Sequence, residues 1–420
     1  MNNQTDNSKI VIIGAGIAGL CISFYLTKQN IPHIIIERGE VANTWINERW
    51  DNFHLVNPNW AIKIPEFGFG TKTFPSKNAD GFLNKNETVN YIKSFAKYIG
   101  TNILSNENVN HLTKEKNKFI VTTSKRIIKS DKVVIASGAF GNAYIPKINK
   151  GLNKDILQIH STEFKNSKKL PEGGVLVVGS GQSGAQIAEE LLEEGKNVWL
   201  AVSKCGRRPR EYRGKDSSWW NYEMGSFDKT VDNTPVEQRW TCSPHTSGSK
   251  GGHDINLINL VEHGLNLCGT VENCGVGEIL FKDNLYQNLK FSDDHAINWA
   301  KKVDDYISKN NLKFPFEKII RDKRIEKFKT KNNKKISAPQ DIKSIIWSTG
   351  FRYNYDWINL NITNTKGHPI QKRGVTKYDG LYFMGLQWMH SSKSAQFVGV
   401  AEDAEFIVED IVSKNKKRNQ

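Results

Sequence analysis

The chain has 420 residues, and its 59 lysines and arginines against 44 aspartates and glutamates give a net charge of +15 and a pI of about 9.3. Aromatic residues make up 10% of the chain, which excludes an intrinsically disordered protein. No apolar run of about 20 residues is free of charge and glycine, so no membrane span is expected. The polar N-terminus, MNNQTDNSK, lacks the features of a secretory signal. We therefore expect a cytoplasmic protein of about two or three domains.

The cysteines are few and irregularly spaced, at Cys21, Cys205, Cys242, Cys268 and Cys274. This spacing predicts no disulfide framework. The absence of a CxxC motif excludes the usual dithiol of a disulfide reductase. Cys242 and His245, with the two later cysteines, fit no standard zinc spacing, so no metal site is expected.

The first predicted elements form a βαβ unit. Residues 9–13 are a short apolar run typical of a buried parallel strand, residues 17–28 have helical spacing, and residues 33–37 form the next strand. The looser region that follows is predicted to contain a helix at 87–99, strands near 118–123 and 132–136, and a connection over 139–173.

The same pattern returns in the middle of the chain. It predicts a strand at 174–179, a helix at 184–195 and a strand at 197–203. Residues 206–275 have weak periodicity and are expected to form an irregular insert or lid. The last predicted elements are a helix at 293–310, a basic exposed stretch at 321–335, a strand at 342–350 and a helix at 394–413.

The first unit contains a GxGxxG motif, GAGIAG at 14–19. At this spacing the first glycine allows a tight turn, the second lets the backbone approach a pyrophosphate, and the third lets the helix pack closely on the strand. Glu37 ends the next strand, where an acid accepts hydrogen bonds from ribose hydroxyls and repels a 2′-phosphate. The unit therefore favours FAD or NAD over NADP.

The second unit contains the same motif, GSGQSG at 179–184, but its second strand ends without a carboxylate. Ser203 and Lys204 stand there instead, followed by Arg207 and Arg208. Hydroxyl, ammonium and guanidinium groups suit a 2′-phosphate. The second unit therefore predicts an NADP(H) site.

The positive charge is concentrated where that phosphate would lie. Residues 204–215 hold a dense basic segment, and the rest of the excess is scattered over surface stretches such as 114–118 and 321–335. A charge run of this kind is usually solvated surface. We expect no nucleic-acid partner.

The two motifs, in this order, resemble those of flavin-dependent monooxygenases. The resemblance is to the flavin-containing monooxygenase and Baeyer–Villiger group (class B flavoprotein monooxygenases), in a short bacterial branch, and it covers nearly the whole chain. Its further carriers are Trp45 after Glu37, RWDNFHLVNPNW at 49–60, IASG at 135–138, IIWSTGF at 345–351 and GLYFMGLQWMH at 380–390.

One signature of the group is only partly present. His160 and the pair Phe164-Lys165 match the FxGxxxHxxxW/Y pattern with its basic residue, but Ile156 and Lys154 replace the expected Gly and Phe. The choice between Baeyer–Villiger and heteroatom oxygenation therefore stays open. His160 is either a residue that orients the linker between domains or a structural histidine.

The resemblance implies an α/β fold of two Rossmann-like dinucleotide-binding domains, with the NADP domain inserted into a discontinuous FAD domain. The FAD domain is expected over 1–168 and 341–420, and the NADP(H)-binding domain over 169–340 with its irregular lid-like insert at about 206–275. The implied reaction passes a hydride from NADPH to FAD, forms a C4a-(hydro)peroxyflavin with O2, and gives one oxygen atom to a small molecule. A homodimer is compatible with the sequence.

The resemblance also assigns site residues. Asn57 falls at the family's flavin-adjacent asparagine and is the catalytic candidate; the alternative is a turn-forming asparagine before Pro58. The residues assigned to FAD are Gly14, Gly16, Ile17, Ala18, Gly19, Glu37, Arg38, Trp45, Val109, Gly138, Gly350, Gly385 and Gln387. Those assigned to NADP(H) are Gly179, Ser180, Gly181, Gln182, Ser183, Gly184, Ser203, Lys204, Arg207 and Arg208. A helix from about Ser394 is expected to aim its N-terminus at the flavin, with Trp388 and His390 in the turn before it.

Three functions follow in order of preference. The first is N- or S-oxygenation of a small nucleophilic substrate by an FAD- and NADPH-dependent monooxygenase. The second is Baeyer–Villiger oxidation of a ketone, and the third is an NADPH-dependent flavin reductase or electron carrier. The sequence does not identify the substrate.

Overall fold

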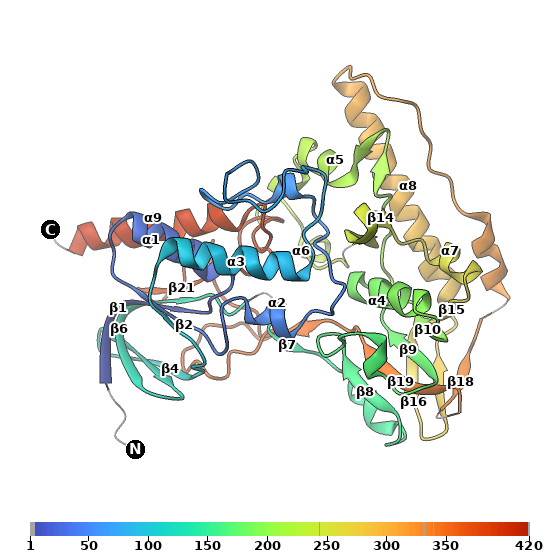
Figure 1. Ribbon diagram of the computed structural model, residues 1–420, viewed down its shortest axis with the longest axis horizontal. Coiled ribbons are helices and arrows are strands. Elements are labelled where there is room, and N and C mark those ends of the chain that lie inside the picture. Colours follow the sequence, from blue (N-terminus) through green and yellow to red (C-terminus); the bar gives the residue numbers. More distant parts are fainter. Residues whose placement is uncertain (1–4, 139, 243, 331, 339, 419–420) are drawn as a thin grey trace.

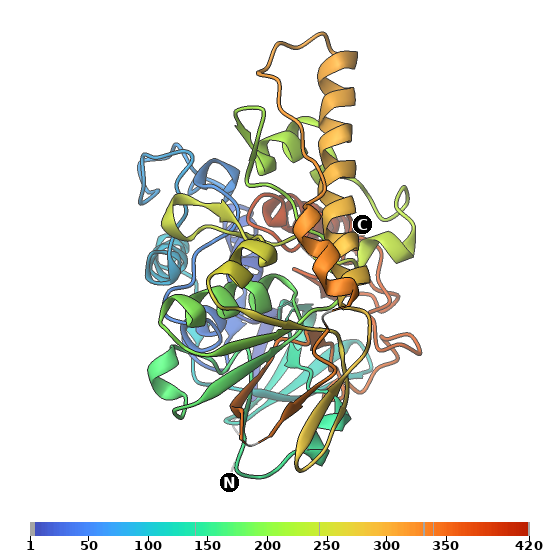
Figure 2. The same ribbon diagram turned by 90° about the vertical axis from the view of Figure 1, so that its right-hand side faces the viewer.

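A computed structural model of the protein describes residues 5–138, 140–242, 244–330, 332–338 and 340–418. Within these residues the chain forms two main β-sheets, each covered by helices, and Figure 1 shows them side by side. The long helix α8 (Leu285–Lys309) runs along the outer side of the second half, as the turned view in Figure 2 shows. None of the described helices has the length and apolar character needed to cross a bilayer.

The first sheet is built around β1, whose residues Ile10 to Ile12 are fully buried. It contains parallel strands and an antiparallel meander, in which β5 pairs with both β4 and β6. Three helices pack beside it, α1 (Ile17–Lys28), α3 (Lys85–Ile99) and α9 (Val400–Arg418) (Figure 1). In spatial order the strands are β3 (Ile103–Leu104), β2 (Ile34–Ile36), β1 (Thr5–Ile13), β6 (Ile127–Ile135), β5 (Lys118–Thr123) and β4 (Val109–Glu115), with β21 (Leu381–Phe383) beside β6.

The second sheet is parallel throughout, and every residue of its strand β9 is buried. Helix α4 (Gln182–Glu193) joins β9 to β10 and repeats the βαβ arrangement of the first sheet. The strand order is β15 (Asn266–Cys268), β10 (Val198–Ala201), β9 (Gly174–Val178), β19 (Ile342–Trp347) and β8 (Leu157–His160). A small antiparallel sheet of β16 (Val271–Cys274), β17 (Glu278–Phe281) and β18 (Lys335–Ser337) follows.

Short elements cover the space between the sheets. The helices are α2 (Asn43–Asn47), α5 (Ser217–Glu223), α6 (Val236–Arg239) and α7 (Leu257–Glu262). The strands are β7 (Asn142–Ala143), β11 (Glu211–Tyr212), β12 (Lys215–Asp216), β13 (Thr246–Ser247), β14 (His253–Asp254) and β20 (Phe351–Arg352). The 3-10 turns are η1 (Asn59–Ala61), η2 (Lys147–Gly151), η3 (Ser167–Lys169), η4 (Ser226–Asp228), η5 (Ser249–Gly251) and η6 (Lys323–Lys329).

The chain crosses between the two sheets at β7 and β20, which pair antiparallel. His160 lies beside this crossing, fully buried, with its Nε2 3.1 Å from the carbonyl oxygen of Gly350 and its Nδ1 3.0 Å from Thr162 Oγ1. Burial lowers the pKa of His160, so the neutral ring predominates at neutral pH. The histidine therefore fastens the outgoing and returning connections to each other.

Several predicted boundaries differ from the structure. The expected connection over 139–173 contains β8, and the expected irregular insert ends in the regular strands β15 and β16. These strands are only three or four residues long, too short to show a periodicity. The last helix begins at Val400 rather than at Ser394, because Ser394 Oγ accepts hydrogen bonds from the backbone of His390 and Ser391 and closes a turn there.

Candidate functional site

The turn between β1 and α1 is shaped by glycines. Gly14 has φ of +113°, and a Cβ atom there would lie 2.4 Å from the carbonyl oxygen of Ala136. A Cβ on Gly19 would lie 2.0 Å from the carbonyl oxygen of Gly14, so only glycine lets the helix approach the strand. A Cβ on Gly16 would meet nothing within 4 Å. The N-terminus of α1 is therefore open at Gly16, on the side of a cavity.

Glu37 is held beside this turn with a 7% exposed side chain. Its Oε2 accepts a hydrogen bond from the backbone N–H of Ala15 at 2.8 Å, and its Oε1 accepts one from Gly39 at 3.1 Å. Because the carboxylate also lines the cavity, its remaining lone pairs are available to hydroxyl donors placed there. This is the arrangement expected at a ribose.

The turn between β9 and α4 repeats the first one. Gly179 has φ of +99° and would clash with the carbonyl oxygen of Ser348 if it carried a Cβ, and Gly184 would clash in the same way with Gly179. Ser180 Oγ accepts a hydrogen bond from the backbone N–H of Ser203 at 3.0 Å, which ties the turn to the end of β10. The two GxGxxG motifs therefore have the same local geometry.

Both turns open on one cavity of about 640 Å³ between the two sheets. The structure brings many of the predicted residues together in its wall. These are Gly16, Ile17, Ala18, Glu37, Arg38, Trp45, Asn57, Gly138, Gln182, Ser183, Arg208, Gly385 and Gln387.

Other predicted residues are not part of that wall. Gly14, Gly19, Gly179 and Gly184 shape the turns, Ser180 and Gly181 belong to the second turn, and Gly350 lies in the crossing. Val109 is the first residue of β4 and packs against the first hydrophobic core. Ser203 and Lys204 follow β10, and the Lys204 ammonium lies over the ring of Phe291.

Arg207 forms an ion pair with an acid of α8. Its Nε donates a hydrogen bond to Asp293 at 2.7 Å, and both side chains are nearly buried, 12% and 5% exposed. The residue lines neither of the two cavities described here. This ion pair therefore connects α8 to the segment that follows β10.

Asn57 belongs to a chain of side-chain amides in the cavity wall. Its Nδ2 donates to Oε1 of Gln396 at 3.1 Å, and Gln396 Nε2 donates to the carbonyl oxygen of Ser392 at 2.9 Å. These bonds fix the orientation of the Asn57 amide. Gly385 lies opposite, where a Cβ would come within 2.6 Å of the Ala18 side chain.

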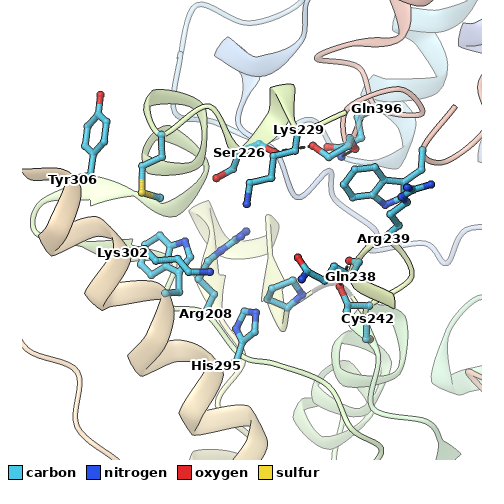
Figure 3. A pocket seen from close by; sticks show the side chains of 16 residues that line it. Arg208, Ser226, Lys229, Gln238, Arg239, Cys242, His295, Lys302, Tyr306 and Gln396 are labelled. Atoms are coloured by element: carbon cyan, nitrogen blue, oxygen red, sulfur yellow. Dashed lines mark hydrogen bonds between the residues drawn. The ribbon is translucent and has the colours of Figure 1, made fainter. Parts of the chain in front are cut away.

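A second cavity of about 540 Å³ adjoins the first and shares Arg208, Arg239, Trp388 and Gln396 with it. Five basic groups line it: Arg208, Lys229, Arg239, His295 and Lys302. Figure 3 shows His295, Lys302 and Tyr306 along α8, across the cavity from Lys229 and Gln396.

This second cavity has the electrostatics of an anion site. No aspartate or glutamate is among its described lining residues, and none of the five basic groups belongs to an ion pair of the described chain. Burial lowers the pKa of Arg208 to about 10 and the nearby Asp216 opposes this shift, so the charge of Arg208 is retained at neutral pH. An anionic ligand would supply the missing counter-charge.

Sequence reasoning did not single out several residues of these walls. Arg49 lies in the first cavity with its guanidinium 5.4 Å from the Trp45 ring centre and 5.6 Å from that of Phe53. Burial lowers its pKa. The motif RWDNFHLVNPNW contained this residue, but Gln396, Arg239 and Lys302 lie in segments without a readable motif.

Comparisons with known proteins place the fold. The family Pyridine nucleotide-disulphide oxidoreductase matches residues 11–225. An oxidoreductase named CzcO-like from Geobacillus kaustophilus (strain HTA426) is 30% identical over 407 residues, covering 96% of this chain and 98% of its own. "Probable indole-3-pyruvate monooxygenase YUCCA10" from Arabidopsis thaliana is 29% identical over 217 residues, 49% of this chain and 54% of its own.

A solved structure gives the same fold. The flavin-containing monooxygenase from Stenotrophomonas maltophilia aligns with a TM-score of 0.65 at 15% identity, over 97% of this chain and 99% of that one. These matches confirm the α/β fold of two Rossmann-like units and the resemblance to the class B flavoprotein monooxygenases.

Proposed function

Because the chain belongs to the pyridine nucleotide-disulphide oxidoreductase family, we propose that it is an NADPH-dependent FAD monooxygenase that oxygenates a nitrogen or sulfur atom of a small molecule. The single observation that carries this proposal is that two dinucleotide turns with opposite charge chemistry open on one cavity. An acid stands at the first turn, and unpaired basic groups surround the space beside the second.

The first turn has the features that FAD requires. Gly16 leaves room for a pyrophosphate at the N-terminus of α1, and Glu37 presents lone pairs where a ribose would lie. Arg49, half-buried against aromatic rings and without an ion-pair partner in the described chain, supplies a positive charge in the same wall. These groups together would hold the pyrophosphate and ribose of FAD.

The second turn and its neighbouring cavity suit NADPH. Ser203 and Lys204 follow the end of β10, the position at which this fold contacts the 2′-phosphate of NADPH. Arg208 and Lys302 add charges that form no ion pair with a carboxylate of the described residues. We therefore keep Ser203, Lys204 and Arg208 as the proposed phosphate contacts, and replace Arg207 by Lys302.

FAD, when bound, takes a hydride from NADPH and activates O2 so that one oxygen atom reaches the substrate. The residues of this chain position and shield that chemistry. Asn57, with its amide oriented by Gln396, presents one N–H and one oxygen to the cavity. Trp45, Phe53 and Trp388 contribute apolar surface that excludes water from the reacting groups.

Two other functions are outcomes of the same test. Baeyer–Villiger oxidation of a ketone needs the same cofactors, and a flavin reductase would use them without oxygenating a substrate. Disulfide reduction, which the family name includes, would need a dithiol facing the flavin. No cysteine is among the described lining residues of the larger cavity.

The test begins with purified protein reconstituted with FAD. NADPH added without oxygen should bleach the flavin, and NADH should do so more slowly; a flavin that stays oxidised contradicts the proposal. NADPH oxidation in air is then followed over a panel of amines, sulfides and ketones, with product mass and H2O2 yield recorded together. N- or S-oxides support the proposal, esters from ketones support Baeyer–Villiger chemistry, and H2O2 equal to the NADPH consumed with every compound supports a reductase.

Two variants separate positioning from binding. Asn57→Ala should leave anaerobic flavin reduction unchanged and raise the H2O2 yield, because the oxygen transfer loses its oriented amide. Gln396→Ala should shift the H2O2 yield in the same direction by a smaller amount, since it acts through Asn57. A slower flavin reduction in Asn57→Ala would assign the residue to NADPH binding instead.

We further propose a cytoplasmic location, with O2 and a small molecule as partners. Cys21, Cys268 and Cys274 are buried free thiols, which suits a reducing compartment.

A further inference from the structure

Two cysteines meet at the second dinucleotide turn. The segments that carry Cys205 and Cys242 run side by side, because Arg207 and His245 form a β-bridge and the His245 N–H donates to the carbonyl oxygen of Gly206 at 3.3 Å. The buried His245 ring also contacts the turn, with Nε2 2.5 Å from the carbonyl oxygen of Ser180. The pair is therefore anchored against the second GxGxxG motif.

Cys242 lies on the N-terminus of α4. Its Sγ is 3.2 Å from the point where a Cβ on Gly181 would lie, and it accepts a hydrogen bond from the backbone N–H of Gln182. A side-chain hydrogen bond links the two sulfur atoms, and Cys205 Sγ also lies 3.7 Å from the carbonyl oxygen of Gly206. The bond from Cys205, followed by the one from Gln182, lowers the pKa of Cys242.

This sulfur lies in the space that the motif keeps open for a ligand. The second glycine of GxGxxG lets a pyrophosphate approach the backbone, and the first N–H groups of the helix bind it. At the first turn no described residue lies within 4 Å of the equivalent Cβ position on Gly16. At the second turn the segment around Cys242 must withdraw before a pyrophosphate can reach Gly181.

We propose that Cys205 and Cys242 are an oxidation site that controls access of NADPH: a disulfide between them fixes the segment 240–242 over Gly181, and its reduction lets the segment withdraw. The inference rests on the proposed function, because NADPH is the ligand whose pyrophosphate this turn would bind.

The chemistry needs a peroxide as the oxidant. The Cys242 thiolate attacks one oxygen of H2O2, which breaks the O–O bond and leaves a sulfenic acid at Cys242 and hydroxide. Cys205 then attacks the Cys242 sulfur, the S–S bond forms, and the sulfenic oxygen leaves as water with the remaining protons. The two thiols are oxidised by two electrons, and one H2O2 is reduced to two molecules of water. A flavin monooxygenase that turns over without substrate releases this oxidant itself.

The pair is distinct from the other cysteines and from the flavin wall. Cys242 is exposed and lines the smaller cavity, whereas Cys21, Cys268 and Cys274 are buried. Burial raises the pKa of Cys274 to about 11 and raises that of Cys21 and Cys268. The pKa of the buried Cys205 is raised as well, by its hydrogen bond to Cys242 and then by burial, so Cys242 is the thiol that peroxide attacks and Cys205 is the one that resolves the sulfenic acid. Cys242 is absent from the described lining of the larger cavity, so the pair acts on nucleotide access rather than as a dithiol reduced by the flavin.

The test uses the FAD-loaded full chain, reduced with dithiothreitol, freed of reductant and treated with stoichiometric H2O2. Intact mass should fall by about 2 Da, the loss of two hydrogens, and a peptide map should join Cys205 to Cys242. Calorimetry with 2′,5′-ADP reports binding at the adenosine end, and anaerobic NADPH titration reports flavin reduction. We expect oxidation to raise the NADPH concentration for half-maximal flavin reduction about tenfold or more, and dithiothreitol to reverse the change.

Matched variants identify the sulfur atoms. Peroxide should leave NADPH use unchanged in Cys205→Ser and in Cys242→Ser, while Cys274→Ser should respond as the wild type does. Circular dichroism checks the fold of each variant; if Cys205→Ser, at a buried position, fails to fold, Cys242→Ser at its exposed position decides. Three outcomes overturn the inference: a mass gain on Cys242 without a disulfide, a disulfide that leaves NADPH binding unchanged, or a disulfide that NADPH reduces through the flavin.

Failure of the proposed function gives a different result. If NADPH does not bleach the flavin of the reduced protein, the proposed function fails. Intact mass, the peptide map and 2′,5′-ADP binding then still show whether the disulfide forms and whether it closes the turn.

Discussion

The two dinucleotide turns have almost the same backbone but different surroundings. In both, the first and third glycines pack against a neighbouring carbonyl group, and a helix begins directly after the second. Around the first turn stands Glu37 with open space at Gly16. Around the second stand unpaired basic groups, with a sulfur atom against Gly181. The glycine spacing therefore sets the local shape, and the residues brought from other segments decide which ligand each turn accepts.

The largest effects should come from filling the second glycine of each motif. Gly16→Ala places a methyl group where the FAD pyrophosphate would lie, and Gly181→Ala does the same for NADPH. We expect a loss of affinity of about 100-fold in each case, from a clash of about 3 kcal/mol. Gly16→Ala should lose FAD on gel filtration. Gly181→Ala should keep FAD and need more NADPH, and loss of FAD from that variant would contradict the assignment of the two turns.

A smaller effect is expected from the acid of the first turn. Glu37→Gln removes the charge that accepts hydrogen bonds from Ala15 and Gly39 and from the proposed ribose. Because a charged hydrogen bond contributes about 1.5–3 kcal/mol, FAD should bind about 10- to 100-fold more weakly. Fluorescence titration of the apoprotein with FAD measures this change. Glu40→Gln is the matched control, since Glu40 is exposed and paired with Lys93 at the surface.

The basic residues at the second turn are tested by the preference of the enzyme for NADPH over NADH. Lys204→Ala and Arg208→Ala should each reduce the ratio of kcat/KM for NADPH over NADH by about tenfold, because a lost charge-assisted phosphate contact costs about 1.5 kcal/mol or more. Activity with NADH should hardly change. Lys215→Ala serves as the control, because its ammonium lies over Trp219, away from both cavities. An equal loss with both nucleotides would show that the residue acts on the fold.

The smallest effect concerns the helix that follows the second turn. Helix α1 has no acid in contact with the other half, whereas Glu190 on α4 accepts a hydrogen bond from Asn52 at 3.3 Å. Burial, and then the nearby Glu194, raises the pKa of Glu190 to about 7. A raised carboxyl pKa means that stability is fully present below the unfolded value near 4.5 and is lost as pH rises through about 7.

Glu190→Gln should therefore raise Tm at pH 8 by about 1–2 °C and leave it unchanged near pH 4. Thermal melts of both proteins across this pH range measure the difference. A gain that is the same at pH 4 and pH 8 would show that ionisation of Glu190 is not its cause.

Much of the fold could be predicted because its signals are local. Each signal of the first βαβ unit depends only on residues a few positions apart: the apolar run before Gly14, the glycine spacing and the helical pattern of 17–28. Helix α1 accordingly occupies the predicted range. The short strands β8 and β15 could not be predicted, since each owes its place to pairing with β19 or β10 across the sheet. The late start of α9 has a local cause, because hydrogen bonds to the Ser394 side chain close a turn where a helical turn was expected.

The sequence by itself determined the two dinucleotide motifs, the acid at the first and the basic segment after the second, because backbone conformation and charge are properties of neighbouring residues. Only the tertiary structure decided how those charges are used. It places Arg207 in an ion pair with Asp293 and Arg208 in no ion pair of the described residues, orients Asn57 through Gln396, and brings Cys242 onto Gly181. Each of these contacts joins residues far apart in the chain, and no local pattern records which distant side chain will lie opposite. The net charge of +15 and the basic segment thus pointed to an anionic ligand. The packing of α8 against the second turn decided which basic side chains line the smaller cavity, where that ligand would bind.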